Sequence, residues 1–258
     1  MHQQDSLIAL FEVLLNIRDC NRNNALESEE FRFLKFATSL LHLSRSQLLQ
    51  DLWVLFELNR KNNGYFVEIG AADGEFLSNT HILETQFGWT GSLSEPNPVW
   101  HDKLYRSRKA FISQCCISDR SHETAAFIQT PLPEYSTFEE FVESDSCAHY
   151  RTGGKRQVVN TLTLCDFLAM AGAPRRIDYL SIDTEGSEFK ILSDFDFKRY
   201  QISIITVEHN YTANRKAIEQ RLTDEGFTRK FEKFSRWDDW YINKFNLRTS
   251  LDDYRTTV

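Results

Sequence analysis

Residues 65–74, YFVEIGAADG, join a short apolar run to a turn bounded by glycines. The run YFVEI is almost continuously apolar, which is typical of a parallel strand that is buried on both faces. Gly70 and Gly74 lack the Cβ atom, so the backbone of the turn can bend sharply and approach a ligand closely. The pattern predicts the first strand of a parallel sheet, with a ligand site where that strand ends.

The segments that follow alternate between extended and helical patterns. The expected strands are 91–95, 110–117, 177–183 and 202–208, and the expected helices are 77–87, 98–106, 187–195 and 213–225. This alternation predicts an α/β fold with a doubly wound sheet and helices on both faces. Residues 226–245 instead hold two strands with no helix between them, which predicts an antiparallel hairpin at a sheet edge. A mostly parallel seven-stranded sheet with such a hairpin is the Rossmann-like plan of methyltransferases, whereas nicotinamide dehydrogenases usually continue in parallel.

Two parts of the chain lie outside this alternation. Apolar residues recur at helical spacing in three early segments, 6–19, 33–41 and 48–56. They predict a helical annex over residues 1–60, followed by the sheet domain over residues 61–258. Residues 131–157 form an insert, and a structureless insert of this length is usually a lid or a disordered loop. We expect the insert to lie over the active site.

Composition limits the kinds of protein that the chain can be. Its 258 residues exceed the roughly 150 of a typical domain, which fits one α/β domain with an attached segment. The net charge of −7 repels the phosphates that a nucleic-acid groove must attract. No window approaches the ~18 uninterrupted apolar residues of a membrane span. Residues 1–15 lack the features of an export signal, and five cysteines without a C-x-x-C pair indicate reduced thiols, so we expect a cytoplasmic protein.

The turn after the first strand favours one cofactor class. It departs from the dinucleotide pattern G-x-G-x-x-G, because Ala72 occupies the middle glycine position and Glu68 lies two places before the first glycine. This favours S-adenosylmethionine over NAD, although an ordinary tight turn is the alternative. Exposed N–H groups at the start of the next helix would suit an anionic part of the cofactor. Glu95 ends the next strand, at the position where a carboxylate can accept hydrogen bonds from both ribose hydroxyls. The alternative is that Glu95 is a solvated charge at the end of a strand.

Several ordered motifs together resemble the FkbM family of S-adenosylmethionine-dependent methyltransferases over about residues 46–245. They are SQLLQD, GYFVEIGAADGEFLSNT, GWTGSLSEPNP, TLTLCDFL, DYLSIDTEGSEFKIL and ITVEHN. The resemblance implies O-methylation of a hydroxyl on a sugar, a glycan or a polyketide-like molecule. The residues expected to bind the methyl donor are Glu68, Gly70, Ala71, Asp73, Gly74, Asn79, Thr80, Glu95, Pro96, Ser118, Asp119 and Asp183.

Polar residues that end two later strands are the candidates for chemistry. Because a hydroxyl must lose its proton as its oxygen attacks, Asp183, Glu185 and His209 are expected to orient the acceptor and take up that proton. A hydrogen-bonded strand-end histidine is the alternative for His209. Asp183, Glu208 and Asn210 offer oxygen ligands that would suit Mg²⁺, which would lower the pKa of the hydroxyl.

We therefore expect an O-methyltransferase that acts on a small molecule or a glycan. One alternative is a nicotinamide oxidoreductase. The other is a non-catalytic module that keeps the cofactor pocket and binds a partner protein through residues 1–60. The aromatic residues of the insert and of residues 237–240 would stack on a sugar ring of the acceptor. The alternative is that they only pack within the core or the hairpin. The sequence leaves both a monomer and a homo-oligomer open.

Overall fold

The computed structural model describes residues 15, 18, 19, 28–248 and 250. It divides into two compact units, residues 1–42 and residues 43–258. In the first unit, α2 (Glu29–Thr38) begins after Ser28, whose hydroxyl accepts a hydrogen bond from the Phe31 N–H. Of the helix expected over residues 6–19, the structure describes only residues 15, 18 and 19, which are helical.

The boundary between the units differs from the expected end of the annex at residue 60. Helix α3 (Gln50–Glu57) belongs to the second unit, where six of its eight residues are buried. Trp53 stacks on Trp240 with ring centroids 5.0 Å apart, and the Gln50 amide donates to Asp238 at 2.6 Å. Residues 43–60 are thus part of the sheet domain, because the apolar face of α3 is buried against the last strand.

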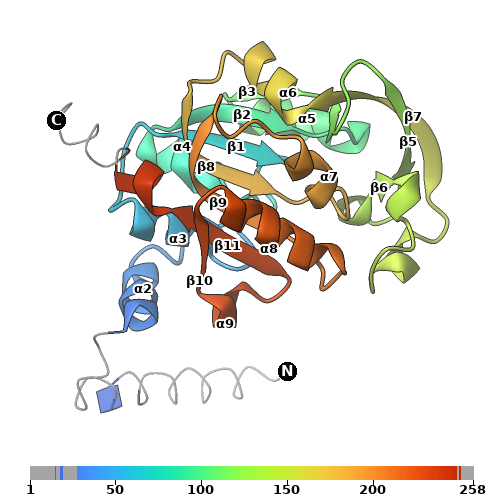
Figure 1. Cartoon of the computed structure of the whole chain (residues 1–258). Helices are drawn as coiled ribbons and strands as arrows, with labels where there is room; N and C mark the ends of the chain where they lie inside the picture. Colours follow the sequence, from blue (N-terminus) through green and yellow to red (C-terminus); the bar gives the residue numbers. More distant parts are fainter. Residues whose placement is uncertain (1–14, 16–17, 20–27, 249, 251–258) are drawn as a thin grey trace. The chain divides into compact units, whose positions relative to one another are not determined.

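A seven-stranded sheet forms the centre of the second unit (Figure 1). Its strands are β1 (Tyr65–Ile69), β2 (Thr90–Ser94), β3 (Phe111–Ser113), β8 (Arg176–Ile182), β9 (Gln201–Glu208), β10 (Phe227–Lys230) and β11 (Asp238–Asn243). They lie in the order β10-β11-β9-β8-β1-β2-β3, and β11 pairs antiparallel with both of its neighbours. The other pairs are parallel. The mostly parallel sheet with a C-terminal reversed strand is therefore confirmed.

Helices cover both faces of this sheet. They are α3, α4 (His81–Phe87), α5 (Pro98–Ser107), α6 (Leu164–Met170), α7 (Glu188–Ser193) and α8 (Asn214–Asp224). Side chains of α6, α7 and α8 share one core with β1, β8, β9 and Tyr241, whereas the adjacent Trp240 contacts α3. Neighbouring residues of a strand point to opposite faces, so α3 lies across the sheet from α6–α8.

Two local differences from the expected elements bear on the site. A short helix, α9 (Glu232–Ser235), lies between β10 and β11, where no helix was expected. Helix α4 begins at residue 81 rather than 77, because the preceding residues are held in an irregular loop.

In the described part of the chain, no helix has both the length and the apolar character that a membrane crossing needs.

A second, four-stranded sheet lies beside the first. It has the order β4-β7-β5-β6, with β4 (Cys116–Ser118), β5 (Thr124–Gln129), β6 (Thr137–Phe138) and β7 (Lys155–Thr163). The strand expected over residues 110–117 is therefore two strands that belong to different sheets, β3 and β4. The insert is not structureless, because it contains β6, the start of β7 and three 3-10 helices: η2 (Pro133–Tyr135), η3 (Glu139–Phe141) and η4 (Ala148–Arg151).

Candidate active site

A cavity of about 660 Å³ lies at the carboxyl ends of β1, β2, β8 and β9. Residues Ile69, Ser94, Asp183 and Glu208 line it, each at or next to the end of one of these strands. This is the edge at which open α/β sheets bind ligands, and the volume lies within the ~300–1,000 Å³ of typical small-molecule sites.

The structure brings together most of the residues singled out from the sequence. Those that line the cavity are Glu68, Gly70, Ala71, Asn79, Glu95, Pro96, Asp183, Glu185, Glu208 and Asn210. Those that do not line it are Asp73, Gly74, Thr80, Ser118, Asp119 and His209. Cys116, Ile117, Trp100 and Tyr211 also line it, although no sequence motif marks them.

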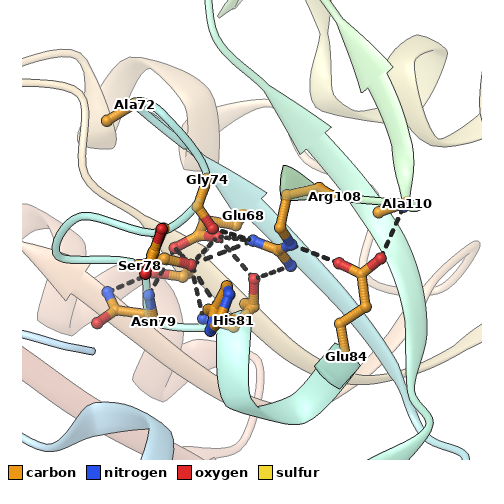
Figure 2. A network of polar contacts seen from close by, with 12 residues as sticks. Glu68, Ala72, Gly74, Ser78, Asn79, His81, Glu84, Arg108 and Ala110 are labelled. Carbon is orange, nitrogen blue, oxygen red and sulfur yellow. Dashed lines mark hydrogen bonds and ion pairs between the residues drawn. The ribbon is translucent and has the colours of Figure 1, made fainter. Parts of the chain in front are cut away.

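Glu68, at the cavity wall, is held by the loop that precedes α4 (Figure 2). Its carboxylate accepts hydrogen bonds from the Ser78 hydroxyl at 2.9 Å, the Asn79 N–H at 2.7 Å and the Thr80 hydroxyl at 2.6 Å. These bonds fix residues 78–80 and explain why the helix begins late. Glu68 therefore anchors the loop, and its carboxylate is already engaged.

Arg108 completes this network with a side chain that is fully buried. It donates to the Gly74 carbonyl at 3.1 Å and to the Thr80 hydroxyl at 2.8 Å, and it pairs with Glu84 (Figure 2). Its guanidinium also lies 3.5 Å from the Glu68 carboxylate. Arg108 thus neutralises the buried carboxylate of Glu68 and the half-buried carboxylate of Glu84, and it ties the glycine loop to the end of α5.

The amides of the glycine loop are bonded within the protein. Gly70 and Ala71 both donate to the Ser94 carbonyl, at 2.9 and 3.2 Å, and Gly74 donates to the Ala71 carbonyl at 2.9 Å. Ala72 donates to Glu95 at 2.9 Å. None of these four loop amides is free for a ligand, and at the start of α4 the Thr80 and His81 N–H groups donate to the Ser78 hydroxyl.

Gly70 is required by the close approach of two backbone segments. Its φ is +86°, and a Cβ atom would lie 1.8 Å from the Asp183 carbonyl oxygen. Gly70→Ala is expected to lower the free energy of unfolding by ~3 kcal/mol, in addition to the cost of holding alanine at a positive φ. No rotamer change relieves this overlap, because the clashing atom belongs to the backbone. Gly172→Ala is the control, since Gly172 has φ +63° and open space around it, and it should cost only about 1–2 kcal/mol. Equal losses in urea unfolding would contradict the steric explanation.

Glu95 follows β2 and presents a buried carboxylate to the cavity. One of its oxygens accepts from the Ala72 N–H at 2.9 Å, and the other accepts from the Asn97 N–H at 2.7 Å. Burial raises the pKa of Glu95 to about 7, and the nearby Asp183 adds to the rise. The carboxylate is thus rigidly held and changes its charge near neutral pH.

Three carboxylates meet at the ends of β8 and β9. Ligand atoms of Asp183, Glu185 and Glu208 all lie within 4.8 Å of one another. Burial raises the pKa of each, and the mutual repulsion of these carboxylates adds to the rise for Glu185 and Glu208. One oxygen of Glu208, Oε2, is buried without a hydrogen-bond partner. Such a cluster is suited to taking up a proton or a cation.

Arg151 links the insert to this cluster. Its buried guanidinium donates to Glu185 at 2.7 Å and to Asp145 at 2.9 Å, and its Nε donates to the Tyr135 carbonyl at 3.2 Å. The insert contributes seven lining residues to the cavity, namely Pro133, Glu134, Tyr135, Ser136, Phe138, Ser146 and Cys147. The insert therefore forms one wall of the cavity, and Arg151 fastens that wall to Glu185.

His209 does not reach the cavity. Its Nδ1 accepts from the Tyr211 N–H at 3.0 Å, and its Nε2 lies 3.7 Å from Asp239. Burial lowers the pKa of His209. Because His209 and Glu208 are consecutive at the end of a strand, their side chains point in opposite directions, and only Glu208 lines the cavity. This arrangement fits the alternative of a packed strand-end histidine.

The remaining predicted residues outside the cavity have partners of their own. Asp73 pairs with Lys103 at 2.7 Å, and the Ser118 hydroxyl donates to Asp119 at 3.0 Å. Asp119 also lies 3.5 Å from Lys190. Cys116 and Ile117, which immediately precede Ser118, line the cavity in their place.

The chain was compared with known proteins. The family model described as "Methyltransferase FkbM domain" matches residues 68–245. A comparison with curated proteins gives no match. Among solved structures, a precorrin-6y C5,15-methyltransferase from Geobacter metallireducens is 11% identical, with a TM-score of 0.37 over 70% of this chain and 71% of that one. A human methyltransferase 10 domain-containing protein is 10% identical, with a TM-score of 0.40 over 76% of this chain and 80% of that one.

Proposed function

The chain belongs to the FkbM methyltransferase family, and on that premise we propose that it transfers a methyl group from S-adenosyl-L-methionine to a hydroxyl oxygen of a sugar, a glycan or a polyketide-like molecule. The observation that carries this proposal is the cavity at the carboxyl edge of the sheet, where Glu95 and the cluster of Asp183, Glu185 and Glu208 face one space.

The cavity suits this methyl donor. Glu95 ends β2, the position from which a carboxylate accepts ribose hydroxyls in Rossmann-like folds. Oδ1 of Asn79 is a buried acceptor without a hydrogen-bond partner and suits the ammonium group of the donor. The carboxylates that line the cavity favour a sulfonium cation. When bound, the donor supplies an electrophilic methyl group.

The acceptor hydroxyl is oriented by the carboxylates at the ends of β8 and β9. Glu208 Oε2 accepts the hydroxyl proton, because it lacks another partner and lies within the cluster. Asp183 holds the hydroxyl from the neighbouring strand, and Arg151 fixes the orientation of Glu185. His209 has no part in this arrangement, since it does not line the cavity.

A divalent cation such as Mg²⁺ would fit the same cluster. Asp183, Glu185 and Glu208 offer the hard oxygen ligands that it prefers. The third ligand beside Asp183 and Glu208 would be Glu185, because its carboxylate lies within 4.8 Å of both. The amide nitrogen of Asn210, the ligand expected from the sequence, donates to Glu185 at 3.5 Å. The ion would lower the pKa of the acceptor hydroxyl.

One assay tests the activity and the metal. The purified full chain is incubated with tritiated S-adenosylmethionine and a panel of sugars, glycans and polyketides, before and after dialysis against EDTA. Transfer to an oxygen supports the proposal, and turnover that survives EDTA excludes the ion. Binding of S-adenosylhomocysteine without transfer to any acceptor would favour the non-catalytic module. Thermal stabilisation by NAD but not by S-adenosylhomocysteine would favour an oxidoreductase.

Glu208→Gln separates chemistry from donor binding. The substitution is expected to lower kcat by ~10²-fold or more, because a positioned general base accelerates the chemical step by about 10²–10⁴-fold. Its affinity for S-adenosylhomocysteine should stay within a few-fold of the parent value in calorimetry. Glu143→Gln, on an exposed residue of the insert that does not line the cavity, is the control and should match the parent. An unchanged kcat for Glu208→Gln would remove Glu208 from the reaction.

A further inference from the structure

The charged side chains that line the cavity are all of one sign. They are Glu68, Glu95, Glu134, Asp183, Glu185 and Glu208. Within the described part of the chain, no lysine, arginine or histidine lines the cavity. A ligand that enters it therefore meets carboxylates and aromatic rings but no cationic side chain.

The two buried arginines nearest to these carboxylates are already paired. Arg108 is bound by Glu68 and Glu84, and Arg151 is bound by Asp145 and Glu185. Neither arginine lines the cavity. A ligand anion could recruit either of them only by leaving a buried carboxylate without its partner, which is strongly unfavourable.

Backbone amides offer no replacement for these cations at the glycine loop. The N–H groups of Gly70, Ala71, Ala72 and Gly74 all donate to oxygen atoms of the protein. A desolvated anion needs charge or hydrogen-bond donors around it, so the residues described here disfavour one. The proposed donor does not conflict with this, because its sulfonium and ammonium groups outweigh its single carboxylate.

Aromatic side chains also line the cavity and offer a contact surface for an acceptor. Phe76 is 48% exposed and Tyr211 is 66% exposed, and both line the cavity together with Trp100, Tyr135 and Trp237. Tyr135 is stacked on Tyr150 with centroids 4.5 Å apart, which holds its ring in place. Aromatic faces suit the CH face of a sugar ring, and carboxylates accept hydrogen bonds from hydroxyl and ammonium groups.

From this lining we propose that the acceptor is an uncharged or amino-substituted sugar, and that sugars bearing a carboxylate, phosphate or sulfate group are rejected. The inference rests on the proposed function and narrows its substrate class. Glu134, on η2, is the residue best placed to test it, because it lines the cavity, is partly exposed and has no ion-pair partner among the described residues.

The experiment compares matched acceptors that share one ring. Methyl glucoside, methyl glucosaminide, methyl glucuronide and glucose 6-phosphate are offered with tritiated S-adenosylmethionine, and kcat/KM is measured for each. Binding of each sugar to the protein loaded with S-adenosylhomocysteine is measured in parallel by calorimetry. For the neutral and amino sugars, both kcat/KM and binding affinity are expected to be at least tenfold higher than for the two anionic sugars.

Charge reversal at one position identifies the cause. Glu134→Lys should reduce the ratio of kcat/KM for neutral sugars to kcat/KM for anionic sugars at least threefold. Glu143→Lys makes the same change in net charge at an exposed site outside the cavity, and it should leave this ratio unchanged. Anionic sugars that bind and react as well as neutral ones would overturn the inference and leave the proposed function intact. If no sugar binds or reacts while S-adenosylhomocysteine binds, the sugar part of the proposed function is wrong and the inference falls with it. Equal effects of the two lysine variants would also overturn the inference.

Discussion

Arg151→Met is expected to destabilise the protein by about 3–5 kcal/mol, as for other buried ion pairs that lose one partner. The Arg151 side chain is fully buried and pairs with Asp145 and Glu185, whose carboxylates would remain inside without a counter-charge. Its hydrogen bonds to the carbonyls of Tyr135 and Val142 would be lost as well. Urea unfolding of the full chain measures the loss.

Two further variants make this expectation specific. Arg156→Met removes an arginine from the same insert, but its partner Glu139 and its own side chain are more than half exposed, so the cost should be below about 1 kcal/mol. Glu185→Gln added to Arg151→Met should recover part of the loss, because it removes one uncompensated charge. A cost for Arg151→Met no larger than that for Arg156→Met would show that Arg151 does not fasten the insert.

Glu95→Gln is expected to weaken binding of S-adenosylhomocysteine by about 10- to 100-fold, because a hydrogen bond to a charged group contributes about 1.5–3 kcal/mol. The amide can still accept one of the two backbone hydrogen bonds that hold Glu95, so the fold should persist. Calorimetry gives the affinity, and thermal unfolding checks the fold. Glu75→Gln, on the glycine loop between β1 and α4 but outside the cavity, should bind S-adenosylhomocysteine normally. Unchanged affinity for Glu95→Gln would show that the ribose is bound elsewhere.

The same carboxyl group predicts the pH dependence of donor binding. Burial raises the pKa of Glu95 to about 7, so its charged form, which accepts hydrogen bonds from hydroxyls, becomes populated as the pH rises through 7. Affinity for S-adenosylhomocysteine should therefore increase from pH 6 to pH 8, by roughly tenfold at most for one group. In Glu95→Gln this part of the increase should disappear. Parallel pH profiles for the two proteins would contradict the assignment.

Local patterns were sufficient to predict the sheet and several lining residues. A strand buried on both faces and a turn that needs Gly70 are features of neighbouring residues, and they lead directly to β1 and the loop that follows it. Glu95 and Asp183 lie at the ends of similar apolar runs, and both line the cavity. The reversed strand was predictable because no long helix separates it from β10.

Other features depend on contacts between residues that are distant in sequence. Arg108 meets Glu68 across 40 residues, and Arg151 meets Glu185 across 34, so no local pattern marks either arginine. The sequence predicts no regular structure for the insert, because β6 has only two residues and is recognised by its pairing with β5. His209 was expected in the site because the alternation of side chains at the end of β9 could not be fixed from sequence alone.

A crystal structure of the full chain with S-adenosylhomocysteine tests the central claim most directly. The account predicts that the ribose contacts Glu95, that the adenosyl group lies in the 660 Å³ cavity, and that the sulfur faces Asp183 and Glu208. Density for the ligand at another surface, with this cavity filled only by water, would contradict it.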